Sequence, residues 1–211
     1  MAKSRLQLVR GGRAPGSEGP MDDRELAAAA REGDEGAFAS LVERHSGGLH
    51  RVISRMLADE EEAWDVVQMA WLRAWQRLSR YDRRWSFSTW LYRIATNLAI
   101  DVIRSRGSRA RAHSRGGEVW LRPAPTAGRP AALADEWEVE GILGRLVRTL
   151  SPQQRAAFVL REVEGLDTSE VATVLECSQA TVRNHVFQAR RRLRRALERD
   201  FPEYLPHGER G

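Results

Sequence analysis

Arginine and amide side chains gather on one face of a predicted helix in the stretch from Asp167 to Leu197. Asp167 and Glu170 have the spacing of a capping box, which predicts a short helix. Glu176 and Cys177 follow as a turn, and Ser178 predicts the start of a second, longer helix. Apolar residues line one side of the second helix: Val182, Val186, Ala189 and Leu193. The other side carries Arg183, Asn184, Gln188, Arg191, Arg192 and Arg195.

Guanidinium and amide groups on one helix face suit the phosphates and base edges of nucleic acid. Two helices joined by a tight turn, the second one rich in arginine, indicate a helix-turn-helix. Such a unit places its second helix in the DNA major groove. The alternative is a helical hairpin with a solvated basic face. One-sided arginine without compensating acid favours DNA.

A second set of chemically active side chains occupies the polar stretch SRYDRRWSFS, residues 79–88. Its arginine and aromatic residues are Arg80, Tyr81, Arg83, Arg84, Trp85 and Phe87. Aromatic rings interleaved with arginine suit a single-stranded nucleic acid, because each stacked base contributes about 1–3 kcal/mol. The alternative is that Trp85 and Phe87 fix the next helix to the core, and composition alone does not decide between the two.

A third set opens a predicted helix over residues 60–78. Its start, Asp59 to Asp65, is acidic, which suits the positive end of a helix dipole. Trp64, Gln68 and Trp75 lie off its apolar stripe, which consists of Ala63, Val67, Ala70, Trp71, Ala74 and Leu78. The acids either stabilise the helix or form, with the exposed Trp and Gln, a docking surface for a basic protein. Composition favours the first interpretation.

The remaining periodicity predicts an all-α fold of two small helical domains joined by a flexible linker. Capping residues and apolar stripes predict helices from Asp22, from Asp34 to Leu57 and from Thr89 to Arg106. Together with the helix predicted over residues 60–78, they form a four-helix domain over 21–106. Residues 1–20 should be a disordered tail and 107–134 a flexible basic linker. Helices resume near Asp135, Ser151 and Gln154 predict another capped helix, and the second domain covers 135–199 before a short tail, 200–211.

Composition restricts the classes of function. The 211 residues carry a formal net charge of +5 with a pI of about 10.2, which favours an anionic partner. Cys177 is the only cysteine, so a disulfide within the chain and a Cys/His metal cluster are excluded. The sequence shows no long apolar run, so we expect no membrane insertion and a cytoplasmic location. It contains no phosphate-binding glycine loop or paired catalytic carboxylates, and its five histidines are scattered, so we expect neither an enzyme nor a cofactor.

Three stretches in order resemble a known family. They are DVVQMAWLRAWQRL at 65–78, FSTWLYRIATNLAIDVIRSR at 87–106, and LSPQQRAAFVLREVEGLDTSEVATVLECSQATVRNHVFQARRRLR at 150–194. Together they resemble bacterial RNA polymerase sigma factors of the sigma-70 family, in the small extracytoplasmic-function (ECF) group. The resemblance extends from Asp22 to Leu197. It implies a protein that binds core RNA polymerase, recognises promoter DNA and promotes strand opening without covalent chemistry.

The resemblance also implies residue roles. Contacts with the coiled coil of the polymerase β′ subunit would come from Asp65, Gln68 and Trp71. Capture of the unwound minus-ten element would involve Arg80, Tyr81, Arg84, Trp85, Phe87, Trp90 and Asn97. Reading of the duplex minus-thirty-five element would involve Arg183, Asn184, Phe187, Gln188, Arg191 and Arg192, with Arg190 and Arg195 near the backbone. Asn184 stands where the family usually has serine, and Gln188 where it usually has a basic residue.

The resemblance further implies a linker that threads the polymerase, contact with its β subunit, and an anti-sigma factor as a partner. A stand-alone helix-turn-helix regulator would explain residues 135–197 equally well. It would not explain the Trp-rich stretch from Asp65 to Arg106. A pure interaction protein, with its arginines as solvated faces, is the remaining alternative.

Overall fold

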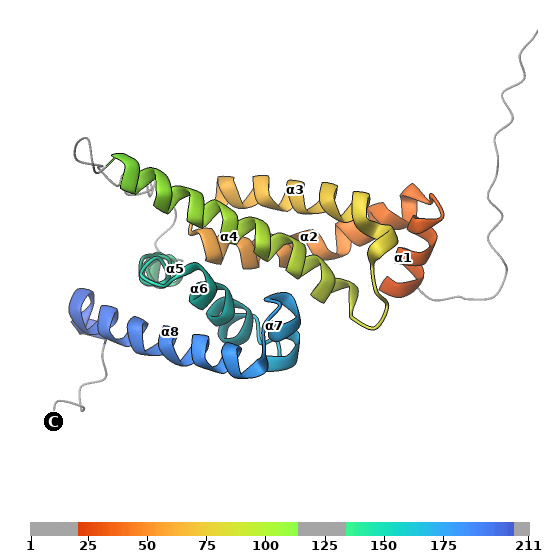
Figure 1. The fold of residues 1–211 in the computed structure, drawn as a ribbon. Helices are drawn as coiled ribbons and strands as arrows, with labels where there is room; N and C mark the ends of the chain where they lie inside the picture. The colour runs from red at the N-terminus through yellow and green to blue at the C-terminus, as the bar shows by residue number, and fades with distance from the viewer. Residues whose placement is uncertain (1–20, 114–133, 205–211) are drawn as a thin grey trace, which may run out of the picture.

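A computed structural model of the protein describes residues 21–113 and 134–204, and within them it contains helices and no strands. The chain forms two layers of helices, one above the other (Figure 1). This all-helical architecture confirms the predicted fold class. The expected tails at 1–20 and 205–211, and the segment 114–133 of the expected linker, lie outside the described residues.

The first layer consists of α1 (Asp23–Arg31), α2 (Glu35–Leu57), α3 (Glu60–Arg77) and α4 (Phe87–His113), with a short 3-10 turn, η1 (Leu78–Arg80), before the loop to α4. Side-chain caps set the starts of the first three. The Asp22 carboxylate accepts hydrogen bonds from the backbone of Arg24 and Glu25, both at 2.8 Å, and completes the predicted capping box. Asp34 and Asp59 cap α2 and α3 through single bonds of 3.0 Å.

Helix α4 is longer than the sequence predicted. It begins at Phe87 instead of Thr89, and the Ser86 hydroxyl accepts a 3.0 Å bond from the Thr89 amide. It also continues past Arg106 and through Gly107 to His113. A glycine inside a helix costs only about 1 kcal/mol, so Gly107 weakens the helix without ending it. The first part of the expected linker is therefore helical.

The second layer consists of α5 (Ala134–Val147), α6 (Pro152–Phe158), a π-helical turn η3 (Val159–Val163), α7 (Thr168–Val174), α8 (Gln179–Asp200) and a final 3-10 turn η4 (Pro202–Tyr204). Ser151 and Gln154 form the predicted capping box at the start of α6. Gly165 has φ +76°, a left-handed conformation that favours glycine and lets the chain turn into α7. Glu176 takes the same region, φ +52°, in the turn before α8.

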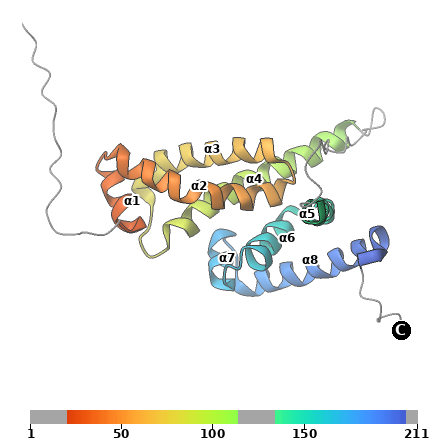
Figure 2. The same cartoon turned by 180° about the vertical axis from the view of Figure 1, so that it is seen from behind.

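The apolar core continues from one layer into the other. Leu41, Ile53 and Leu91 are buried inside the first layer, and Val159 and Val171 of the second belong to the same cluster. Helices α6 and α7 lie between α8 and the pair formed by α2 and α4, with α3 on the opposite side (Figures 1 and 2). The two expected domains therefore share an interface that the sequence did not reveal.

A smaller apolar cluster joins the ends of the second layer. Leu146 of α5, Ala196 of α8 and Phe201 are buried together, and the Arg145 guanidinium lies 5.0 Å from the centre of the Phe201 ring. None of the helices over the described residues combines the length and the apolar character that crossing a bilayer requires.

Candidate nucleic-acid interface

Helices α7 and α8 meet in a well-capped helix-turn-helix. The Asp167 carboxylate accepts bonds from the backbone of Ser169 at 2.7 Å and of Glu170 at 2.8 Å, and Glu170 bonds back to the Asp167 amide at 2.9 Å. Hydrogen bonds from Ser169 and Glu170 hold the pKa of the Asp167 carboxyl below its usual value. The Ser178 hydroxyl caps α8 by accepting a 3.1 Å bond from the Thr181 amide. These contacts fix the angle at which α8 leaves the turn.

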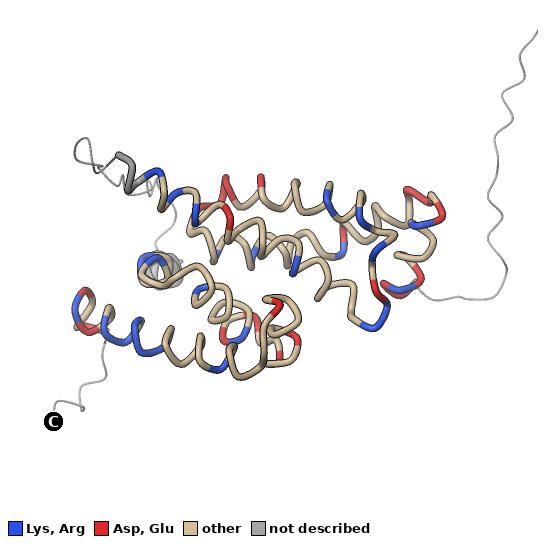
Figure 3. Tube along the Cα trace, in the orientation of Figure 1, with Lys and Arg blue, Asp and Glu red and all other residues tan. Residues whose placement is uncertain are grey.

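One face of α8 is buried against its own domain and the other faces solvent. Val182 and Ala189 are buried, whereas Phe187 is 61% exposed and Gln188 is half-buried. The remaining predicted reading residues are exposed: Arg183, Asn184, Arg191 and Arg192. Basic positions recur along α8 in Figure 3. The first turns of α8 thus present polar, basic and one large apolar side chain together, which suits base edges and thymine methyls in a major groove.

Not every arginine on α8 is available to phosphate. Arg190 forms an ion pair with Glu162 of η3, and Arg194 pairs with Glu198 at 3.0 Å. Arg183 reaches back over the helix, where its Nε lies 3.4 Å from the Gln179 carbonyl oxygen. The expectation that Arg190 attracts the DNA backbone is therefore weakened, because Glu162 already neutralises it.

The loop before α4 divides its aromatic residues into buried and exposed ones. Tyr81 is buried, and its hydroxyl donates a 2.9 Å bond to the Trp85 carbonyl. Phe87 is only 1% exposed, with its ring centre 5.5 Å from that of Tyr81 and 5.6 Å from that of Trp90. In this structure Tyr81 and Phe87 shape the loop from beneath and cannot themselves touch DNA. Burial also raises the pKa of the Tyr81 hydroxyl.

The other predicted minus-ten residues are accessible to different degrees. Trp85 is 43% exposed, and Arg80, Arg84 and Asn97 are exposed, whereas Trp90 is half-buried. Arg84 forms an ion pair with Asp82 at 2.6 Å, and this bond holds the pKa of the Asp82 carboxyl below its usual value. The exposed set therefore clusters around Trp85 at the tip of the loop, with Asn97 farther along α4.

Helix α3 carries an exposed apolar surface that only partly matches the prediction. Asp65 and Gln68 are exposed as a contact surface requires. Trp71, however, is 8% exposed and its indole N–H donates a 3.0 Å bond to the Ser46 hydroxyl, so it belongs to the core. The exposed large side chains of this helix are Trp64, Met69, Leu72 and Trp75.

The sequence contained a signal for this surface. Trp64 and Trp75 fall off the apolar stripe, as noted, but so do Met69 and Leu72, which repeat the helical spacing of Asp65 and Gln68. Four exposed apolar side chains beside an acidic helix start form a surface suited to a protein partner. This surface, made by Trp64, Asp65, Gln68, Met69, Leu72 and Trp75, is called the α3 face below.

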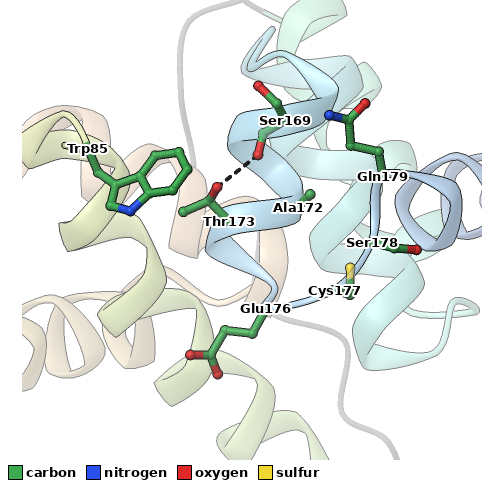
Figure 4. A pocket seen from close by; sticks show the side chains of 8 residues that line it. All are labelled: Trp85, Ser169, Ala172, Thr173, Glu176, Cys177, Ser178 and Gln179. Carbon is green, nitrogen blue, oxygen red and sulfur yellow. Dashed lines mark hydrogen bonds between the residues drawn. The ribbon is translucent and has the colours of Figure 1, made fainter.

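A hollow of about 500 Å³ separates the loop from the helix-turn-helix. Trp85 lines one side, and Thr173 of α7, Cys177 of the turn and Gln179 of α8 are among the residues that line the other. In Figure 4 the indole of Trp85 points across toward α7. The indole of Trp85 thus points toward the second layer, while 43% of the residue's surface stays exposed to solvent.

Comparison with known proteins agrees with this arrangement. Residues 41–109 match the family Sigma-70 region 2, and residues 140–193 match Sigma-70, region 4. The chain is 34% identical over 184 residues to the RNA polymerase sigma-H factor of Pseudomonas aeruginosa, covering 83% of this chain and 94% of that protein. It is 31% identical over 180 residues to the ECF RNA polymerase sigma-E factor of Escherichia coli, covering 81% and 91%.

A solved structure supports the same assignment. The chain aligns with CnrH, solved in complex with the cytosolic domain of CnrY, with a TM-score of 0.61 and 28% identity, covering 84% of this chain and 98% of that one. One matched region lies in each layer, region 2 within α2–α4 and region 4 within α5–α8. The chain belongs to the sigma-70 family of RNA polymerase sigma factors, in the ECF group.

Proposed function

We propose that this sigma factor joins core RNA polymerase through the α3 face, captures the unwound minus-ten strand with the loop around Trp85, and reads the minus-thirty-five element with α8. The observation that carries this proposal is the α3 face. A helix-turn-helix regulator that acts alone has no use for an exposed acidic and aromatic surface on a separate helical layer. An initiation factor of this kind supplies contacts to polymerase and DNA and no covalent chemistry.

The exposed side chains at the start of α8 read the duplex. Arginine forms paired bonds with guanine, whereas asparagine and glutamine pair with adenine. Arg183 and Asn184 therefore set which bases are accepted, and Phe187 adds an apolar contact for a thymine methyl. Arg191 and Arg192, one to two turns farther along, face the phosphates.

Trp85 captures the single strand, together with Arg80 and Arg84 of the same loop and Asn97 on α4. A base turned out of the duplex loses its stacking, which costs a few kcal/mol, and an aromatic side chain offsets that loss. Tyr81, Phe87 and Trp90 hold the loop in shape beneath Trp85, so their role is positioning. This division follows from which rings the fold leaves in solvent.

The α3 face docks on the polymerase, and Asp65 and Gln68 are its polar residues. Its acidic start suits a basic partner surface, in agreement with the expected β′ coiled coil. We propose that the β subunit contacts the second layer. We also propose that the protein and the polymerase act in the cytoplasm, where the DNA template lies. The CnrH structure contains a bound protein partner, which supports an anti-sigma factor as a further partner of this chain.

Transcription with purified components tests the proposal. The protein and core polymerase are mixed with fragmented genomic DNA from the source, and the starts of the transcripts are sequenced. We expect starts that depend on the protein and that follow two shared motifs about two helical turns apart. If core polymerase gains no activity while the protein alone still binds duplex DNA, the stand-alone regulator is the correct assignment.

A further inference from the structure

A second hollow, of about 540 Å³, lies between α1 and the loop that precedes α4. Arg31 at the end of α1 and Arg83 of the loop line it, together with Ala28 and Glu32. The short side chain of Ala28 fills little of this space. Basic positions on α1 and on the neighbouring loop are visible in Figure 3. Two segments far apart in the chain therefore bring positive charges to one place.

The acidic residues of the first turn of α1 are already bound within the fold. Asp23 accepts a hydrogen bond from Arg44 at 2.6 Å, and its carboxylate lies 2.7 Å from His45 Nε2. Asp22 and Glu25 are the two partners of the capping box at the helix start. These three carboxylates therefore have partners of their own and do not neutralise the arginines of the hollow.

The two arginines of the hollow have no such partner. Asp82, next to Arg83 in the loop, forms its ion pair with Arg84 at 2.6 Å. Over residues 21–113 and 134–204, no hydrogen bond or ion pair involves the side chain of Arg31 or of Arg83, and both residues are exposed. An anion that enters the hollow would meet two free guanidinium groups and one opposing carboxylate, that of Glu32.

The place of the hollow favours the backbone of a single DNA strand as that anion. Arg83 lies two residues before Trp85, the exposed ring on which an unpaired base stacks in the proposed function. Proteins that hold single strands combine such rings with a basic groove that follows the phosphates. A strand that leaves Trp85 in the direction of α1 passes Arg83 and then Arg31.

The two hollows on either side of the loop indicate which part of the strand reaches α1. Trp85 shares its hollow with α7 and the start of α8, whereas Arg83 shares its hollow with α1. In Figures 1 and 2, α1 and α7 lie on opposite sides of this loop. Because α8 reads the upstream element in the proposed function, a strand that continues from Trp85 toward α1 runs downstream.

We propose that α1 and the loop form a binding site for the phosphate backbone of the single strand just downstream of the minus-ten element, with Arg31 and Arg83 as its cations. The site rests on the proposed function and extends strand capture to α1. Glu32 repels the phosphates and limits the affinity of the site. The site selects no bases, because phosphate contacts carry no sequence information directly.

Three labelled strands test the site. All are non-template strands of one promoter mapped by transcript sequencing. The first ends directly after the minus-ten element, the second adds a few nucleotides downstream, and the third adds the same number upstream instead. Fluorescence anisotropy of the full chain assembled on core polymerase gives the affinity for each strand at several salt concentrations. Core polymerase is the same in every assembly, so a difference between variants reports on this chain.

Arg31→Gln removes one charge at an exposed position. It should weaken binding of the downstream-extended strand about two- to fivefold, the range expected for one exposed ion pair. The slope of log affinity against log salt for that strand should become shallower by about 0.7, which corresponds to one phosphate contact of a single strand. Affinity for the other two strands should equal that of wild type. Arg83→Gln should weaken the downstream-extended strand in the same way.

Glu32→Gln should act in the opposite direction and tighten binding of the downstream-extended strand, because it removes the opposing carboxylate. Damage to the fold does not produce such a gain, so this variant separates a binding role from a structural one. Arg104→Gln is the matched control and should match wild type. Arg104 is exposed in the second half of α4, away from the hollow, and its only printed contact is a 4.0 Å ion pair with Asp101.

Three results would overturn the proposal. One is an affinity difference between the downstream-extended and the shortest strand that Arg31→Gln leaves unchanged. Another is equal weakening of all three strands, which would reveal only a long-range effect of charge. The last is weaker binding of Arg31→Gln to core polymerase with unchanged strand affinities, which would assign the hollow to an acidic protein surface.

Failure of the proposed function would look different from failure of this site. The wild-type assembly would then not bind the shortest strand, or Trp85→Ala would bind that strand as tightly as wild type. A working capture loop without the α1 site would instead leave the shortest strand dependent on Trp85, and the added downstream nucleotides would bind independently of Arg31.

Discussion

Trp85 and Phe87 lie two residues apart, yet one is 43% exposed and the other 1%. Trp85→Ala should leave stability within about 0.5 kcal/mol of wild type, as expected for a surface change. It should slow promoter opening, because a stacking surface is lost. Phe87→Ala should instead lower the free energy of unfolding by about 3–5 kcal/mol, the cost of emptying an aromatic core site.

Thermal melts and permanganate footprinting of promoter thymines would check this pair. Normal thymine reactivity with Trp85→Ala would count against its role in strand capture. An unchanged melting temperature with Phe87→Ala would show that the Phe87 ring does not contribute to the stability of the fold.

Arg183 is exposed on the reading face of α8, and its only described contacts are long ones to Gln179. Arg183→Ala should weaken binding to the upstream promoter duplex by about 1–3 kcal/mol without changing the melting temperature. Arg199→Ala is the matched control, since Arg199 is exposed on the same helix but pairs with Asp200 at its end. Equal duplex affinity of the two variants in a filter-binding titration would remove Arg183 from the reading face.

The sequence predicted which residues cluster in the loop and on α8 but not which of them are exposed. On α8 the apolar period separates Val182 from Arg183, so exposure follows directly. The loop has no period. Tyr81 lies inside because its ring packs on those of Phe87 and Trp90 and its hydroxyl bonds to the Trp85 carbonyl. Ring packing of that kind leaves no periodic pattern in a sequence.

Helix α3 combines a buried stripe with the exposed α3 face. Asp65→Arg should raise the dissociation constant for core polymerase on the order of tenfold, because a positive charge replaces a negative one opposite a basic partner. Stability should change little, since Asp65 is exposed. Glu43→Arg, an equal charge change at an exposed site on α2, is the control. Identical titration curves for the two variants against core would mean that the acidic start of α3 only stabilises the helix.

Four helix starts were predictable, whereas both ends of α4 were not. Asp22, Ser151, Asp167 and Ser178 each accept the capping bond that their position in the sequence predicted. These bonds are local, so a pattern of three or four residues encodes them. The end of α4 has no such pattern. Gly107 indicated a boundary, but the helix continues to His113 because one glycine costs less than the neighbouring residues contribute.

The continuous core predicts how the whole molecule unfolds. Because Val159 and Val171 share one cluster with Ile53 and Leu91, neither layer can lose its packing without exposing apolar surface of the other. We expect a single calorimetric transition in which the calorimetric and van't Hoff enthalpies agree. Differential scanning calorimetry at low and high salt would check this. Two separated transitions would show that the layers unfold independently.

The packing of one layer on the other could not be predicted from the sequence. Ile94 and Val102 of α4 read as the apolar stripe of their own helix, and a stripe does not specify how many neighbours cover it. The ion pairs across the interface join residues far apart in the chain, such as Arg55 with Glu164. Only the three-dimensional arrangement shows that the two expected domains pack against each other through one continuous core.

The two layers belong to the same polypeptide, so their association is intramolecular and follows first-order kinetics. Each half meets the other at a fixed effective concentration set by the connecting chain, whatever the number of molecules in the cell. Doubling the amount of protein would double the packed and separated forms alike and leave their ratio unchanged. Abundance alone therefore cannot separate the two layers; only a partner that binds the separated form more tightly can shift the balance.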